Sequence, residues 1–425
     1  MTLEKLQKKY PVFSYDKVEW QLEKQNLQTR FSFSAGPQMT FVSELTIPNV
    51  SSKEIERVGE KQLHNLFFHL GLVDMLSYWK ATFSPEIKVE AGGLNTEQIK
   101  WWEKIILEGM GQFFYENDID PFVPRIKTKE KEEIELPEVS SEDYLLPQGG
   151  GKDSLVALEI IKQTGKIPSL FIFNPNEKLY QVAEVSETEE IITASRTLDP
   201  KIKQLNKEGF LNGHTPFSAY LAFLSAIIAA LFDKKHIVFA NEKSSEEANT
   251  IYKKKEINHQ WSKTLEFENM FRQYSSNYLL KKLNYFSLMR PLYDIQISSI
   301  FSHLEKYHHV FLSCNSNFKL NGNVEEKWCR SCPKCLNTFL LLKPFLDKEE
   351  LTNIFGGEME REDLLPLRRK LSGEEGIKPL ECVATFKEIN SVINGNTEDL
   401  LDQWDEKHNV PEELQKILWK NLKRN

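Results

Sequence analysis

Short apolar runs alternate with helical stretches over the central part of the chain, from about residue 144 to residue 314. The apolar runs predict strands at 144–147, 169–173, 190–194, 236–240 and 309–313. Longer runs with apolar residues at helical spacing predict helices at 153–163, 217–232 and 297–307. Strand–helix alternation of this kind predicts an α/β fold with a doubly wound parallel sheet.

Polar residues or glycines follow these predicted strands. They are Gly149, Asn174, Arg196, Asn241, Glu242 and Cys314. Open parallel sheets bind their ligands outside the carboxyl ends of the strands. We therefore expect these residues to surround a binding site.

The two ends of the chain have other patterns. Strands are expected at 31–33 and 40–47, then a helix capped by Ser52 that runs to about Lys80, and a helix from a Thr96 cap to about residue 115. The charged segment 127–143 indicates a linker, and from residue 351 the chain is charged and helical, with two tryptophans as packing anchors. Three regions are predicted: an N-terminal α+β domain over 1–140 with a substrate-binding role, a nucleotide-binding α/β domain over 141–345, and a helical C-terminal region over 346–425.

Composition narrows the class of protein. The 425 residues carry a net charge of −8, which argues against a nucleic acid as the main partner. The apolar run 219–232 is too short to span a bilayer, and residues 1–11 lack the apolar core of a secretion signal. Five cysteines, three of them within seven residues, suit a reducing compartment and a metal. A cytoplasmic protein is expected.

A glycine-rich loop joins the predicted strand 144–147 to the helix that follows, with the sequence Gly149-Gly150-Gly151-Lys152-Asp153-Ser154. Glycines let the backbone approach a phosphate, and the N-terminus of the helix favours an anion. Lys152 supplies a positive charge, Ser154 a hydroxyl donor, and Asp153 a ligand for Mg²⁺. The alternative is an ordinary glycine-rich turn. The glycine spacing, with an aspartate between lysine and serine, is not that of a Walker A loop.

This loop resembles the Ser-Gly-Gly-x-Asp-Ser signature of the PP-loop ATP pyrophosphatases, with Gly149 where that superfamily usually has serine. The resemblance implies that ATP is cleaved to AMP and pyrophosphate through an adenylated intermediate. It also implies the cofactor-binding residues Gly149, Gly150, Gly151, Lys152, Asp153 and Ser154.

Cysteines predict a metal centre downstream. Cys329, Cys332 and Cys335 form a Cys-x-x-Cys-x-x-Cys pattern, and Cys314 ends a predicted strand. Four thiolates suit tetrahedral Zn²⁺ in a structural role, and an iron–sulfur cluster is the competing interpretation.

Further segments, in order along the chain, resemble the MurL-type epimerases. They are His69–Gly71, Ser77–Ala81, the loop 149–154, Leu211–Pro216, Ala240–Glu242, Asn258–Lys263, Ser313–Asn315, Trp328–Cys335 and Lys378–Cys382. The resemblance implies an isomerase that converts the terminal L-glutamate of UDP-N-acetylmuramoyl-L-alanyl-L-glutamate to D-glutamate in peptidoglycan precursor synthesis. Adenylation would remove the charge of the carboxylate and make the adjacent Cα–H acidic; a base and an acid would then move the proton, and water would release AMP.

Four residues are candidates for the catalytic chemistry. His214 and His259 are proton carriers, because a neutral imidazole exchanges protons near pH 7; the alternative is a loop histidine held by hydrogen bonds. Glu242 is a candidate base or Mg²⁺ ligand. Lys263, together with Arg196, is expected to hold the pyrophosphate or the diphosphate of the substrate, unless these are solvated loop charges.

Two other functions use the same features. A PP-loop enzyme that modifies tRNA or a nucleobase, by thiolation or nitrile formation, would also explain the glycine-rich loop and the cysteines. An ATP-binding regulator would need no turnover. The products separate the three: AMP with an inverted peptide, AMP with a modified nucleic acid, or no AMP.

Overall fold

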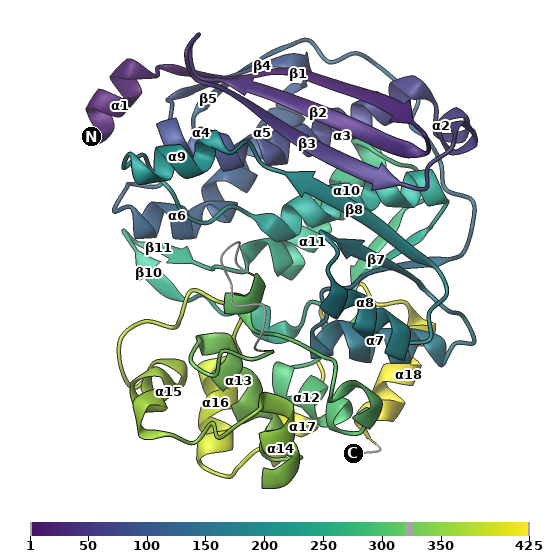
Figure 1. Ribbon diagram of the computed structural model, residues 1–425, viewed down its shortest axis with the longest axis vertical. Helices are drawn as coiled ribbons and strands as arrows, with labels where there is room; N and C mark the ends of the chain where they lie inside the picture. The colour runs from purple at the N-terminus through teal and green to yellow at the C-terminus, as the bar shows by residue number, and fades with distance from the viewer. Residues whose placement is uncertain (1, 319–326, 424–425) are drawn as a thin grey trace.

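The computed structural model describes residues 2–318 and 327–423 (Figure 1). A ten-stranded sheet runs through these residues in the order β12-β9-β6-β7-β8-β3-β2-β1-β4-β5. Neighbouring strands are parallel except at β8–β3, β3–β2 and β2–β1. The strands are β1 Val12–Glu23, β2 Asn26–Ser34, β3 Thr40–Pro48, β4 Glu86–Gly93, β5 Arg125–Lys129, β6 Tyr144–Pro147, β7 Ser169–Phe173, β8 Ile191–Thr197, β9 His236–Phe239 and β12 Asn284–Ser287, with a separate hairpin of β10 Thr250–Tyr252 and β11 Lys255–Ile257.

Helices surround this sheet. In the N-terminal half they are α1 Leu3–Lys9, α2 Ser52–Val58, α3 Glu60–Asp74, α4 Leu76–Thr82, α5 Thr96–Gly109, α6 Gly111–Glu116, α7 Lys152–Lys162, α8 Glu177–Val185 and α9 Lys201–Lys207. After them come α10 Phe217–Phe232, α11 Leu265–Tyr278, α12 Asp294–Ser302, α13 Pro333–Leu342, α14 Lys348–Phe355, α15 Leu365–Ser372, α16 Phe386–Ile393, α17 Glu398–Leu401 and α18 Glu412–Leu422.

Two hydrophobic cores lie on the two faces of the parallel strands. Adjacent residues of one strand belong to different cores, as Leu145 and Leu146 of β6 do, because side chains alternate across a sheet. The first core includes α10, which packs on β6, β9 and α3. The second includes α7 and α12, which pack on each other. Helices on both faces and a mostly parallel sheet confirm the predicted α/β fold.

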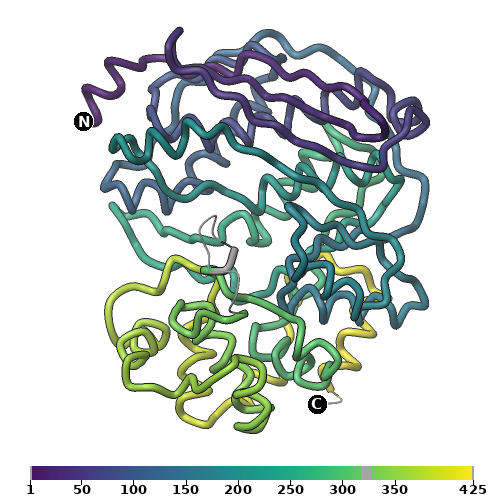
Figure 2. The backbone as a smooth tube through the Cα atoms, in the orientation of Figure 1, coloured from purple at the N-terminus to yellow at the C-terminus, as the bar shows by residue number. Residues whose placement is uncertain are grey.

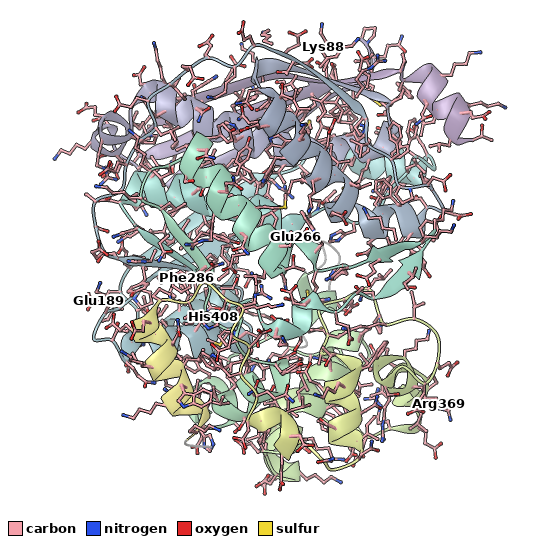
Figure 3. All side chains as sticks on the ribbon, turned by 180° about the vertical axis from the view of Figure 1, so that it is seen from behind. Lys88, Glu189, Glu266, Phe286, Arg369 and His408 are labelled. Atoms are coloured by element: carbon pink, nitrogen blue, oxygen red, sulfur yellow. The ribbon has the colours of Figure 1, made fainter. Side chains whose placement is uncertain are left out.

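The C-terminal helices form the end of the molecule opposite β1–β5 (Figure 1). The backbone trace in Figure 2 shows that the C-terminal end of the chain returns to the side of α7, which α18 contacts. Seen from behind, Lys88 of β4 and Arg369 of α15 lie toward opposite ends of the molecule, and Phe286 of β12 is at an intermediate height (Figure 3). This arrangement confirms the predicted helical C-terminal region. Of the two tryptophans predicted to be packing anchors, Trp404 packs against Trp419, and Trp419 is itself exposed.

Several predicted elements differ from the structure. The helix expected from residue 52 to 80 is three helices. Gly59, with a φ of +91°, separates α2 from α3, and α3 and α4 meet at Met75. Its cap is Ser51, which forms a capping box with Glu54, and the cap of α5 is Asn95. Both predictions placed the cap one residue too late.

The predicted strand 309–313 was wrong. Its backbone meets the glycine-rich loop and pairs with no strand: the N–H of Leu312 donates to the carbonyl of Gly150 at 2.9 Å. The helix predicted before it begins earlier, at Asp294, and ends at Ser302.

The charged segment 127–143 begins inside β5 and continues without a further helix or named strand to Asp143. The sheet joins strands from both sides of this segment. The division into three regions stays a prediction. No helix within the described residues is long and apolar enough to cross a membrane.

Candidate active site

The glycine-rich loop links β6 to α7, as the pattern predicted. Gly150 has a φ of +79°, a conformation that favours glycine, and Gly151 is the N-cap of α7. A Cβ placed on Gly149 would meet nothing within 4 Å, so the packing of the described residues leaves open space in front of it. The loop is held from behind by Gln148, whose Oε1 accepts hydrogen bonds from the N–H of Gly150 at 2.8 Å and from Ser154 Oγ at 2.5 Å.

Lys152 is only 2% exposed and lies between two carboxylates. Its Nζ pairs with Asp153 Oδ1 at 2.5 Å and with Asp294 Oδ1 at the start of α12. Burial alone would lower the pKa of Lys152, but these two carboxylates outweigh it and raise the pKa above the ordinary lysine value. The lysine is therefore a fixed cation at the base of the loop.

Glu242 follows β9 and is 6% exposed. Its pKa is raised to about 7, because burial and the charges of Asp153 and Asp294 outweigh the attraction of Lys263. Three carboxyl groups therefore lie close enough to interact beside the loop. Oxygen ligands of this kind fit Mg²⁺, which proteins hold through one or two carboxylates together with substrate phosphates.

The two predicted histidines lie together. The rings of His214 and His259 are 4.7 Å apart between centroids. His259 Nδ1 lies 2.5 Å from Gln112 Oε1 of α6, and burial, His259 and Lys80 hold the pKa of His214 well below its ordinary value. His214 is therefore neutral in this environment, and a neutral imidazole can accept a proton.

Lys80 and Arg196 add positive charge on the side of the N-terminal helices. Lys80 Nζ donates to the carbonyl of Gly213 at 2.6 Å, and burial, with the charge of Arg196, lowers its pKa to about 8. Arg196 pairs with the buried Asp74 at 3.0 Å and stacks on Tyr220. The guanidinium therefore pairs with a buried carboxylate, and this partner was not predicted from the sequence.

Lys263 interacts with Glu242 and with a cysteine. Its Nζ donates to Cys382 Sγ at 3.1 Å, and its pKa is raised because the charges of Cys382 and Glu242 outweigh the effect of burial. The predicted catalytic residues and the phosphate loop thus form one continuous cluster. Arg196 and Lys80 adjoin it near His214.

The four cysteines of the predicted metal centre converge. The Sγ atoms of Cys314, Cys329, Cys332 and Cys335 all lie within 4.8 Å of one another, and none is in a disulfide. Two of the separations are 3.8 and 3.4 Å, close to the roughly 3.8 Å between sulfurs of a tetrahedron with Zn–S bonds of about 2.3 Å. A multi-iron cluster would hold its thiolates further apart, since its core stands between them. The geometry fits a single ion.

This cluster adjoins the phosphate loop. A Cβ on Gly151 would lie 3.2 Å from Ser313 Oγ, next to Cys314. Cys332 is the N-cap of α13. The charge of Lys334, in the first turn of that helix, acts to lower the pKa of Glu242 and of Asp294. A metal held here would fix one wall of the site.

Comparison with known proteins identifies the family. A family model described as the MurL N-terminal domain matches residues 4–288, and one described as the MurL C-terminal domain matches residues 310–423. The chain belongs to the MurL family.

Curated MurL relatives cover most of the chain. Proteins named UDP-N-acetyl-alpha-D-muramoyl-L-alanyl-L-glutamate epimerase from Micromonospora sp. and Salinispora tropica are each 33% identical to it, over 79% and 83% of this chain and 75% and 77% of their own. The protein of that name from Xanthomonas oryzae pv. oryzae is 31% identical over 85% of this chain and 80% of its own.

Some residues of this MurL site were not expected from the sequence. Asp294 begins a helix and gave no local signal of its contact with Lys152. Cys382 could have been found from the sequence, because it is the one cysteine outside the cluster of four and belongs to a segment that resembles the family.

The raised pKa of Glu242 predicts a pH-dependent effect on stability. A carboxyl whose pKa is higher in the folded state favours folding at low pH, and this contribution is lost as the pH rises from about 4.5 through about 7. The variant Glu242→Gln should therefore gain stability relative to the parent over that range, by on the order of 3 kcal/mol at most. Urea unfolding between pH 5 and 8 measures the difference, with the exposed Glu256→Gln as control. A constant difference between parent and variant across this range would contradict the assignment.

Proposed function

We propose that this protein catalyses the ATP-dependent epimerisation of the terminal L-glutamate of UDP-N-acetylmuramoyl-L-alanyl-L-glutamate to D-glutamate, with release of AMP and pyrophosphate. The observation that carries the proposal is the MurL match over residues 4–288 and 310–423, together with relatives named as this epimerase. Cytoplasmic peptidoglycan precursor synthesis is the setting that this substrate implies.

The phosphate loop supports the ATP step. Gly149–Gly151 offer an approach for phosphate oxygens, Ser154 a hydroxyl, and Lys152 a fixed positive charge. Attack of the glutamate carboxylate on the α-phosphate would break the α–β bond and yield an acyl-adenylate and pyrophosphate. Mg²⁺, when bound by Asp153 and Glu242, would neutralise phosphate charge.

The acid–base cluster supports the proton step. An anionic carboxylate opposes removal of the adjacent proton because a second negative charge would form beside the first, and adenylation removes that obstacle. His214, kept neutral by its surroundings, can accept or relay a proton, and His259 lies against it. Lys80 and Lys263 supply positive charge for the enolate that forms. Zinc at the four cysteines would have a structural role.

Deuterium incorporation tests the function. With ATP, Mg²⁺ and the UDP-sugar dipeptide in D₂O, the protein should place deuterium at the glutamate Cα and yield D-glutamate, with AMP as the nucleotide product. Omission of ATP should abolish exchange. An ATP analogue blocked at the β–γ bridge should still support exchange at Cα, and one blocked at the α–β bridge should not.

Mass spectrometry of the product measures deuterium incorporation, and chiral analysis after hydrolysis measures D-glutamate. ADP as the product would contradict the PP-loop chemistry. AMP with an unlabelled, uninverted peptide would contradict the epimerase and would favour adenylation of another acceptor, such as a nucleobase.

A further inference from the structure

Cys382 lies inside the candidate active site and is not one of the four cysteines of the candidate metal centre. It follows α15 and precedes α16, in a segment 119 residues from its partner Lys263. Lys263 Nζ donates to its Sγ at 3.1 Å, and the side chain of His259 forms a hydrogen bond with it. The sulfur therefore touches two residues predicted to be catalytic.

Two contacts hold the segment that leads to this thiol. Asn249 donates through Nδ2 to the carbonyl of Pro379 at 2.7 Å and accepts through Oδ1 from the N–H of His259 at 2.8 Å. Lys378, which is almost fully buried, pairs with Glu247 at 2.9 Å. One side chain, Asn249, thus ties the cysteine segment to the histidine segment.

The charges around the sulfur favour the thiolate. Burial by itself would raise the pKa of Cys382, but Lys263, the hydrogen bond with His259 and the charge of Lys334 outweigh it and hold the pKa well below the ordinary cysteine value. A buried cysteine with a purely structural role has apolar neighbours and stays protonated, whereas a reactive one lies among cations. Cys382 is of the second kind.

We propose that Cys382 is a catalytic acid–base residue of the epimerisation and that its thiolate, paired with Lys263 and His259, accepts the proton from Cα of the activated glutamate. The inference rests on the proposed function. The Cα–H bond breaks, the proton passes to Sγ as S–H, and the electron pair remains on the substrate as the enolate of the acyl-adenylate. A proton from solvent, relayed by His214 to the opposite face of Cα, then completes the inversion, and the Cys382 thiol returns its proton to solvent. Lys263 compensates the negative charge of the free thiolate.

Variants of Cys382 separate proton transfer from adenylation. Cys382→Ala and Cys382→Ser should keep exchange of labelled pyrophosphate into ATP within about threefold of the parent, since the phosphate loop is intact. Net inversion in D₂O should fall at least about 100-fold, the size expected for loss of a general acid–base group. Serine should not rescue it, because its hydroxyl remains protonated. Lys387→Met, an exposed change in the following helix, is the matched control and should behave as the parent.

A second measurement does not depend on turnover. Iodoacetamide should alkylate Cys382 of the parent at pH 6.5, as peptide mapping will show, and Lys263→Met should slow this at least about tenfold because fewer thiolates remain. Parent-like inversion by Cys382→Ala would overturn the proposal, as would a trapped thioester at Cys382, which would make it a nucleophile. If the parent forms no AMP and no D-glutamate, the proposed function fails instead, and the alkylation result shows whether the thiolate exists.

Discussion

Replacement of Lys152 by methionine is expected to lower the rate of AMP formation by at least about 100-fold. The ammonium group is the positive charge that α7 brings to the phosphate loop, and removal of one preorganised group that stabilises developing charge costs 100- to 1000-fold in rate in typical enzymes. The variant should also unfold more readily. Asp294 would be left buried without its cation, and breaking a buried ion pair costs on the order of 3–5 kcal/mol.

A second substitution separates these two effects. In the double variant Lys152→Met/Asp294→Asn the buried charge is gone, so thermal stability should return toward that of the parent while AMP formation stays low. AMP is measured by chromatography and stability by thermal unfolding. Recovery of AMP formation in the double variant would show that the lysine acts only through the fold.

Loss of one cysteine ligand is expected to have the largest effect on stability. Structural zinc sites contribute on the order of 10 kcal/mol to folding, which is comparable to the whole stability of a typical domain. Cys335→Ser should therefore lose the metal and accumulate as insoluble or partly unfolded protein. Because Cys332 caps α13 and this helix carries Lys334, loss of the metal should also disturb the catalytic cluster.

Elemental analysis provides the check. The parent should contain one zinc per chain, and Cys382→Ser, which alters the cysteine outside the cluster, should retain it. Iron in place of zinc would contradict the assignment, and so would a well-folded parent without metal.

The local pattern of residues predicted the parts of the fold that depend on near neighbours. β6, β7 and α10 have the bounds that their apolar runs predicted, and the glycine-rich loop opens α7. The spacing of three cysteines likewise indicated the thiol cluster. These features follow from the sequence because hydrophobic periodicity and turn geometry act over a few residues.

The tertiary structure alone decided which charges meet. Asp294 lies 142 residues from Lys152, and Cys382 lies 119 residues from Lys263, so no local pattern could pair them. The same holds for residues 309–313, whose apolar run predicted a strand but whose backbone pairs with the phosphate loop. Residue types and spacing can indicate what chemistry is available, but the electrostatics of a site depend on distance and burial in space, which the path of the whole chain determines.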